Sequence, residues 1–137
     1  TQNHQMQLTR NGKTTLLAPN GKNVRYIWPS LSPDGTKVLY YVSGVGCFVC
    51  DLNGNNVKPM GQLRAAKWYD NTTIVGMNDQ DNGEYVTSSS IIAKTLSGAE
   101  QKLTSDEIIA QYPQVSPSSR KIAFETPAGE AYIINLQ

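Results

Sequence analysis

The sequence predicts an all-β protein built from repeated units of four antiparallel strands. Three observations support this: similar segments recur along the chain, turn signals separate short apolar runs, and no segment shows a sustained helical period. The length of 137 residues suits a domain of ordinary size. Aliphatic, aromatic and cysteine residues make up 39% of the chain, which is enough to form a core.

Two markers repeat along the chain at a similar spacing. The first is a proline followed by Ser-Pro, a turn and an apolar run; it occupies residues 29–40 and 113–124, with a degenerate copy at residues 67–75. The second is a leucine after a short strand-like run, at Leu8, Leu52, Leu96 and Leu136. The first marker recurs on average about every 42 residues, and a period of roughly 40–45 residues is that of propeller blades with four strands each.

Turn chemistry supports the strand assignments. Ser32-Pro33-Asp34-Gly35 places proline second and glycine fourth, which suits a type I turn. β-branched and aromatic residues follow over residues 37–42, so the turn is expected to join the two strands of a hairpin.

The next turn is marked by Asn53-Gly54, a strong hairpin signal between the apolar run 47–52 and residues 57–60. Residues 57–60 are expected to form an outer strand, because the Pro59 that they contain is tolerated at a sheet edge.

The second unit repeats this arrangement around Gly98, with strands expected at residues 90–96 and 100–104. The best helix candidate is residues 105–111, where Ser105 would be the N-cap of one or two turns.

These signals divide the chain, taken as a single propeller region over residues 1–137, into four parts with two, four, four and three strands. The expected parts are a partial blade in residues 3–25, blades in residues 26–60 and 65–104, and an incomplete blade in residues 112–137. Propellers close with four to eight blades, so about three blades do not close a ring.

Residues 32–40 (SPDGTKVLY) resemble the blade signature of TolB-like propellers, which also occurs in the N-terminal propeller domains of dipeptidyl peptidase IV-like and prolyl oligopeptidase-like enzymes. Lys102-Leu103-Thr104 resembles the Leu-Thr that closes such a blade, and residues 81–91 resemble the loop that leads into its third strand. The third copy departs from the signature, because residues 118–119 are Ser-Ser instead of Asp-Gly.

The resemblance implies a central channel lined by the first strand of each blade, with loops on two faces. It also implies six or more blades in the intact propeller and a periplasmic or secreted location. The chain, which begins at Thr1 without a leader-like segment, is therefore expected to be a processed product or a part of a larger propeller. The alternative is half of a propeller that a second copy completes, with residues 13–17 of the partner supplying the missing outer strand.

Charge and hydropathy exclude several partner classes. Twelve Lys and Arg residues against eleven Asp and Glu give a net charge of +1, which lacks the excess of a nucleic-acid binder or of a polybasic membrane anchor. No apolar run approaches the roughly 18 residues that a membrane helix needs. The expected partner is a protein or a peptide.

Catalytic chemistry has no candidate constellation. The single histidine, His4, lies near the chain start, and Gly-x-Ser-x-Gly is absent, so the chain is predicted to be non-enzymatic with no cofactor. Cys47 and Cys50 lie three apart in a predicted strand, which directs them to opposite faces. Packing is therefore expected of them in place of metal binding or redox chemistry.

Two groups of residues are candidates for binding. Asp79 and Asp81 lie in an acidic stretch, residues 78–84, for which a solvated turn and a weak calcium site are both considered. Trp28, Arg64 and Tyr112 occupy aligned positions before the first strands. The resemblance places them at the channel rim, and Trp, Tyr and Arg are common at binding hot spots. Packing between blades is the alternative role for these side chains.

The expected function is therefore that of a non-enzymatic propeller module that presents a loop face to a protein or peptide. One alternative is the propeller of a prolyl oligopeptidase-like or dipeptidyl peptidase-like serine peptidase, with its catalytic domain outside this sequence. A propeller that binds a carbohydrate or another small ligand is the other.

Overall fold

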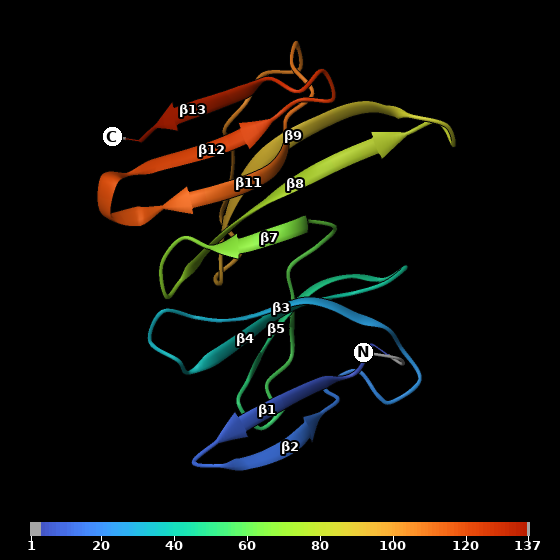
Figure 1. The fold of residues 1–137 in the computed structure, drawn as a ribbon, viewed down its shortest axis with the longest axis vertical. Coiled ribbons are helices and arrows are strands. Elements are labelled where there is room, and N and C mark those ends of the chain that lie inside the picture. Colours follow the sequence, from blue (N-terminus) through green and yellow to red (C-terminus); the bar gives the residue numbers. More distant parts are fainter. Residues whose placement is uncertain (1–3, 137) are drawn as a thin grey trace.

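Thirteen strands form four antiparallel sheets in residues 4–136, the part of the chain that the computed structural model describes (Figure 1). The all-β class expected from the sequence is confirmed, and the sheets contain two, four, four and three strands, as expected. Each sheet is a meander, since strands that follow one another along the chain are neighbours in the sheet.

The sheets follow one another along the chain. The N-terminal hairpin contains β1 (Met6–Arg10) and β2 (Lys13–Leu17). The first four-stranded sheet contains β3 (Tyr26–Leu31), β4 (Lys37–Val42), β5 (Gly46–Asp51) and β6 (Lys58–Pro59). The second four-stranded sheet contains β7 (Arg64–Trp68), β8 (Thr73–Asp81), β9 (Val86–Thr95) and β10 (Glu100–Lys102). The C-terminal sheet contains β11 (Gln111–Ser116), β12 (Lys121–Glu125) and β13 (Ala131–Asn135), with the short 3-10 helix η1 (Pro117–Ser119) between the first two.

Three apolar layers separate the four sheets, which stack along the long axis in chain order (Figure 1). The hairpin layer, next to the N-terminal hairpin, contains Met6, Leu17, Tyr26, Val38, Tyr40, Val42 and Cys50. The central layer, between the four-stranded sheets, contains Leu39, Cys47, Val49, Met60, Leu63, Ala66, Trp68, Ile74 and Ile92. The C-terminal layer contains Ala65, Val75, Met77, Ile91, Ala110, Ile122 and Phe124.

The apolar run of β4 follows from this stacking. Successive side chains of a strand point to opposite faces, so Val38 and Tyr40 enter the hairpin layer while Leu39 enters the central layer. A strand with both faces covered needs apolar residues at nearly every position.

The turn between β3 and β4 has the geometry that its sequence predicts. The amide of Gly35 donates to the carbonyl of Ser32 over 2.8 Å, and Gly35 has φ +72°, in the left-handed region that glycine favours. The Asp34 carboxylate accepts bonds from the Ser32 hydroxyl (2.7 Å) and from the amide and hydroxyl of Thr36 (3.1 and 2.8 Å). These bonds lower the pKa of Asp34 to about 2.

The prediction of a helix at residues 105–111 is wrong, because residues 105–110 form an irregular segment with a turn and a bend, and Gln111 begins β11. It runs from the outer strand β10 to β11, with the amides of Leu103 and Ala110 bonded to carbonyls of β9. These carbonyls, of Ile91 and Ser89, are two residues apart on one strand, or about 7 Å. A helix of seven residues would separate its ends by about 10 Å, so a turned connection fits these bonds better.

Candidate functional site

The first strands of three sheets lie next to one another along one side of the stack. β7 lies between β3 and β11 and contacts both, as Figure 1 shows. In each strand the register against its neighbour shifts at the same place, between Ile27 and Ser30, between Arg64 and Lys67, and between Gln111 and Gln114. This set of aligned strands, here called the inner strip, carries the residues singled out as a binding rim.

One residue in each shifted segment has a left-handed backbone: Trp28 (φ 54°), Ala65 (φ 50°) and Tyr112 (φ 51°). A positive φ is uncommon for residues other than glycine, and β-bulges are over-represented beside functional sites. The repetition of this conformation in three sheets shows that the internal repeat extends to the backbone geometry.

The alignment of Arg64 with Trp28 and Tyr112 is wrong by one residue, since Ala65 takes the equivalent position. The turn from Trp68 to Ile74 is one residue shorter than the turn from Leu31 to Val38. An alignment fixed on the second strands therefore misplaces the first strand of the middle unit by one position.

Arg64 nevertheless meets Trp28 in space. The Arg64 guanidinium carbon lies 5.6 Å from the centroid of the Trp28 ring, within the range of a cation–π contact. Its Nη1 donates to Asp79 Oδ2 over 2.9 Å. Trp28 also meets Tyr41 edge to face, with ring centroids 5.5 Å apart, so the indole ring contacts both a cation and a second aromatic ring.

The Arg64–Asp79 pair is unevenly exposed. The Asp79 side chain is 7% exposed, whereas that of Arg64 is 41% exposed. The second carboxylate oxygen of Asp79, Oδ1, is buried and has no hydrogen-bond partner. The pair thus leaves one accessible cation and one buried acceptor beside an indole ring.

Tyr112 lies apart from this group. No described contact joins its side chain to Trp28 or Arg64, and its ring is exposed beside a shallow hollow of about 170 Å³ over β11 and β12. Its backbone amide donates to the sulfur of Met77 over 3.4 Å. The structure therefore brings together two of the three expected rim residues and adds Asp79 and Tyr41 to them.

Asp79 and Asp81 lie in β8, where the sequence analysis placed a loop. β8 and β9 are the longest strands and project as an arm beyond the sheet (Figure 1), with a turn at residues 82–85. Asp81 Oδ1 accepts a bond from the amide of Gly83 (3.0 Å), and Asn82 Oδ1 accepts from the amide of Glu84 (2.9 Å). In the described part of the chain, no group of three or more His, Cys, Asp or Glu residues is placed to hold a metal ion.

The two cysteines lie on opposite faces of β5, as their spacing predicts. Cys47 is buried in the central layer and Cys50 in the hairpin layer, and both are free thiols. Burial raises the pKa of Cys47 to about 12 and that of Cys50 to about 11. Both side chains pack as small apolar groups.

Sequence reasoning missed a second region of interest, at the N-terminal hairpin. His4, which belongs to no catalytic constellation in the sequence, accepts a hydrogen bond on Nε2 from the Arg25 guanidinium (2.9 Å) and is half-buried. A signal was present, because the chain has four cationic residues and no Asp or Glu before Asp34.

No protein-family model and no curated protein sequence matches the chain. Among residues 4–136, no helix has the length and apolar character needed to cross a membrane.

Proposed function

We propose that the chain is a TolB-like β-propeller module that binds a protein or peptide partner without catalysis. The observation that carries the proposal is the inner strip, with its bulge repeated in three consecutive sheets of one stack. Stacked four-stranded meanders with their first strands on one side are the arrangement of propeller blades around a channel. Each sheet is then a blade, and the inner strip faces the channel.

The chemistry of the inner strip favours a peptide. Trp28 offers a partly exposed aromatic surface, the exposed part of Arg64 can donate to a carbonyl or carboxylate, and Tyr112 adds an exposed ring. Aromatic and arginine side chains held on a rigid scaffold are the groups that dominate binding energy at interfaces. The ion pair with Asp79 holds the Arg64 side chain in place before the ligand arrives.

Selection from a displayed library of random twelve-residue peptides tests this function. Peptides selected on the unaltered protein are expected to lose at least roughly tenfold in affinity on Arg64→Gln and on Tyr112→Ala, as for hot-spot residues. Tyr132→Ala is the matched control, because this tyrosine is exposed to a similar extent on β13 but lies off the strip. Selected peptides that bind both variants as tightly as the unaltered protein would contradict the proposal.

The stack is open at both ends, so a propeller ring requires further sheets. They come either from a second copy of the chain or from a longer parent chain. Sedimentation velocity separates these sources: a dimer of about 30 kDa, twice the chain mass of 15.0 kDa, supports completion by a second copy. A stable monomer excludes the homodimer and leaves the longer chain as the source.

A further inference from the structure

The N-terminal hairpin has a strand edge without a partner. β1 pairs with β2 on one side, and no other described strand pairs with it, whereas the adjacent sheet has four strands. Residues 5–9 in succession line a groove of about 480 Å³. Because successive side chains of a strand point to opposite faces, lining by five consecutive residues shows that the edge of β1 itself borders the groove.

The hairpin loop fixes which backbone groups are free. Asn11 and Gly12 form a two-residue loop with positive φ values of 52° and 78°, which makes the flanking residues Arg10 and Lys13 a hydrogen-bonded pair. Hydrogen-bonded and non-hydrogen-bonded pairs alternate along an antiparallel ladder. The backbone groups of Leu8 therefore point to β2, and those of Gln7 and Thr9 point to the groove.

The opposite wall of the groove is apolar and continues an internal packing layer. Met6, Leu17 and Val38 line the groove and also belong to the hairpin layer. Leu31, on β3, lines it as well and is 51% exposed. If an extended strand paired with β1, every second side chain of that strand would lie against this apolar wall. Alternate side chains of the four-stranded sheets lie against the apolar layers in the same way.

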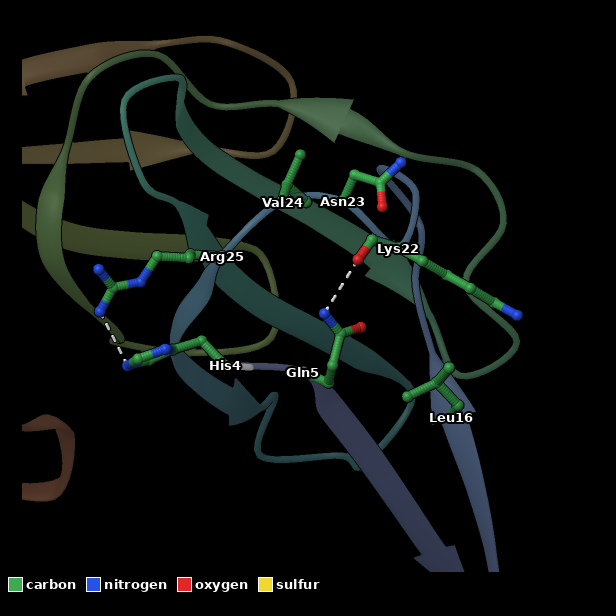
Figure 2. A pocket seen from close by; sticks show the side chains of 7 residues that line it. All are labelled: His4, Gln5, Leu16, Lys22, Asn23, Val24 and Arg25. Carbon is green, nitrogen blue, oxygen red and sulfur yellow. Dashed lines mark hydrogen bonds between the residues drawn. The ribbon is translucent and has the colours of Figure 1, made fainter. Parts of the chain in front are cut away.

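A basic hollow adjoins one end of the groove, and Gln5 lines both (Figure 2). The hollow has a volume of about 730 Å³ and contains Lys22, Arg25 and His4 but no carboxylate. Figure 2 shows Arg25 beside His4 on one side and Lys22 on the other, with Gln5 between them. These two cations belong to the first 33 residues, which contain no acidic residue, so the hollow attracts anionic groups.

Hydrogen bonds to backbone carbonyls hold the residues of the hollow in place. The carbonyl of His4 accepts from the amide of Tyr26 (2.8 Å), and the Gln5 side chain donates to the carbonyl of Lys22 (3.1 Å). Partial burial and the neighbouring guanidinium lower the pKa of His4. Neutral His4 is the form that accepts the hydrogen bond of Arg25, which orients the guanidinium at the hollow.

We propose that the free edge of β1 is a strand-addition site for an extended acidic peptide. The peptide backbone pairs with Gln7 and Thr9, alternate apolar side chains lie in the groove, and carboxylates at the acidic end of the peptide reach Lys22 and Arg25, whose side chains extend to opposite sides of the hollow (Figure 2). The site is remote from the inner strip, and the proposal concerns the open stack, because strands that complete the two-stranded blade in a closed ring would pair along the same edge.

A labelled peptide tests the site by fluorescence polarisation. The probe alternates valine and threonine over six residues and ends in Asp-Glu, and its control ends in Lys-Arg. The acidic probe is expected to bind with micromolar affinity and to weaken at least roughly tenfold on Lys22→Glu/Arg25→Glu. Lys58→Glu/Lys121→Glu, which makes the same change of net charge on strands away from the hollow, is expected to leave binding unchanged.

Proline substitution tests the backbone pairing. Gln7→Pro removes a free-edge N–H without removing a bond to β2, and it is expected to abolish binding. Thr14→Pro removes the equivalent outward N–H of β2 and is the matched control, with thermal unfolding used to confirm that both variants fold. If Gln7→Pro does not fold, binding to the unaltered protein is measured with the same probe methylated on alternate backbone nitrogens, which is expected to abolish binding.

Three results would overturn the proposal. The acidic and basic probes could bind equally, the acidic probe could fail to bind at about 1 mM, or neither Gln7→Pro nor backbone methylation could change its affinity. A concentration-dependent dimer that Gln7→Pro dissociates would show that a second copy occupies the edge, which also contradicts a peptide site.

Discussion

The second four-stranded sheet and the N-terminal hairpin differ in how completely the fold satisfies them. The sheet is covered on both faces, and its charges pair internally, as Arg64 does with Asp79 (2.9 Å) and Lys94 with Glu100 (3.6 Å). The hairpin is covered on one face, has a free edge and has cations without acidic neighbours in the sequence. Buried packing and internal ion pairs are thus concentrated in the middle of the stack. The free strand edge and the cations without acidic neighbours lie at its N-terminal end.

The largest expected effect comes from the central layer. Ile74 has no exposed surface, so Ile74→Ala is expected to lower the free energy of unfolding by about 2–5 kcal/mol through lost burial and a cavity. Ile133→Ala, the same change at a side chain that is 64% exposed on β13, is expected to cost less than about 0.5 kcal/mol. Urea unfolding measures both, and equal losses would contradict the central position of the layer.

A slightly smaller effect is expected from adding one methyl group to β8. A Cβ on Gly76 would lie 2.9 Å from the Cβ of Leu63 and 3.3 Å from that of Ala66, at the bulge of the neighbouring strand β7. Gly76→Ala is therefore expected to cost about 1–3 kcal/mol by overpacking. Thermal unfolding measures it, and an unchanged or raised Tm would contradict the close approach of β8 to the bulge of β7.

A third effect separates pairing from packing in the inner strip. A double-mutant cycle of Arg64→Met and Asp79→Asn is expected to give a coupling energy of about 0.5–1 kcal/mol, because the half-exposed guanidinium is screened by solvent. Arg64→Met alone should destabilise more than the double variant, since it leaves the buried Asp79 carboxylate without its cation. A coupling energy of zero would mean that the pair does not hold Arg64.

The smallest effect is a pH dependence at the β3–β4 turn. The pKa of Asp34, about 2 in the folded chain, lies below its unfolded value of about 3.9, so its charge stabilises the fold above pH 4. This stabilisation is lost as the pH falls toward 2. Asp34→Asn is expected to lower the Tm at pH 7 and to match the unaltered protein near pH 2, as measured by circular dichroism. A constant difference across this range would contradict the role of the charge.

The strands were predictable where turn chemistry and burial agree. Ser32-Pro33-Asp34-Gly35 and Asn53-Gly54 mark turns that the structure contains, and the spacing of Cys47 and Cys50 places them correctly on opposite faces. These features depend on local geometry, which a sequence records directly.

The errors arose where distant residues decide the local structure. The segment 105–111 has a helix-like N-cap signal, but the amides of Leu103 and Ala110 at its two ends are bonded to carbonyls two residues apart on β9. The polar stretch 78–81 resembles a loop, yet it pairs with β9 and presents Asp79 to Arg64. The rim position of Arg64 was misassigned by one residue, because no proline marks the bulge at Ala65.

The N-terminal site was not predictable from local patterns. The absence of acidic residues before Asp34 is visible in the sequence, but the free edge of β1 is not. The free edge becomes apparent only from the strand order, because the adjacent sheet has four strands and the hairpin has two.

Native-state hydrogen exchange compares the middle of the stack with its N-terminal end in one experiment. The amides of β8 and β9 beside Ile74 and Ile91 are expected to exchange only through global unfolding, because both residues are fully buried. The amides of Gln7 and Thr9 are expected to exchange without global unfolding, since they point to the groove. Equal, global protection of all four amides would contradict both the open edge of β1 and the contrast between the closely packed middle of the stack and its N-terminal hairpin.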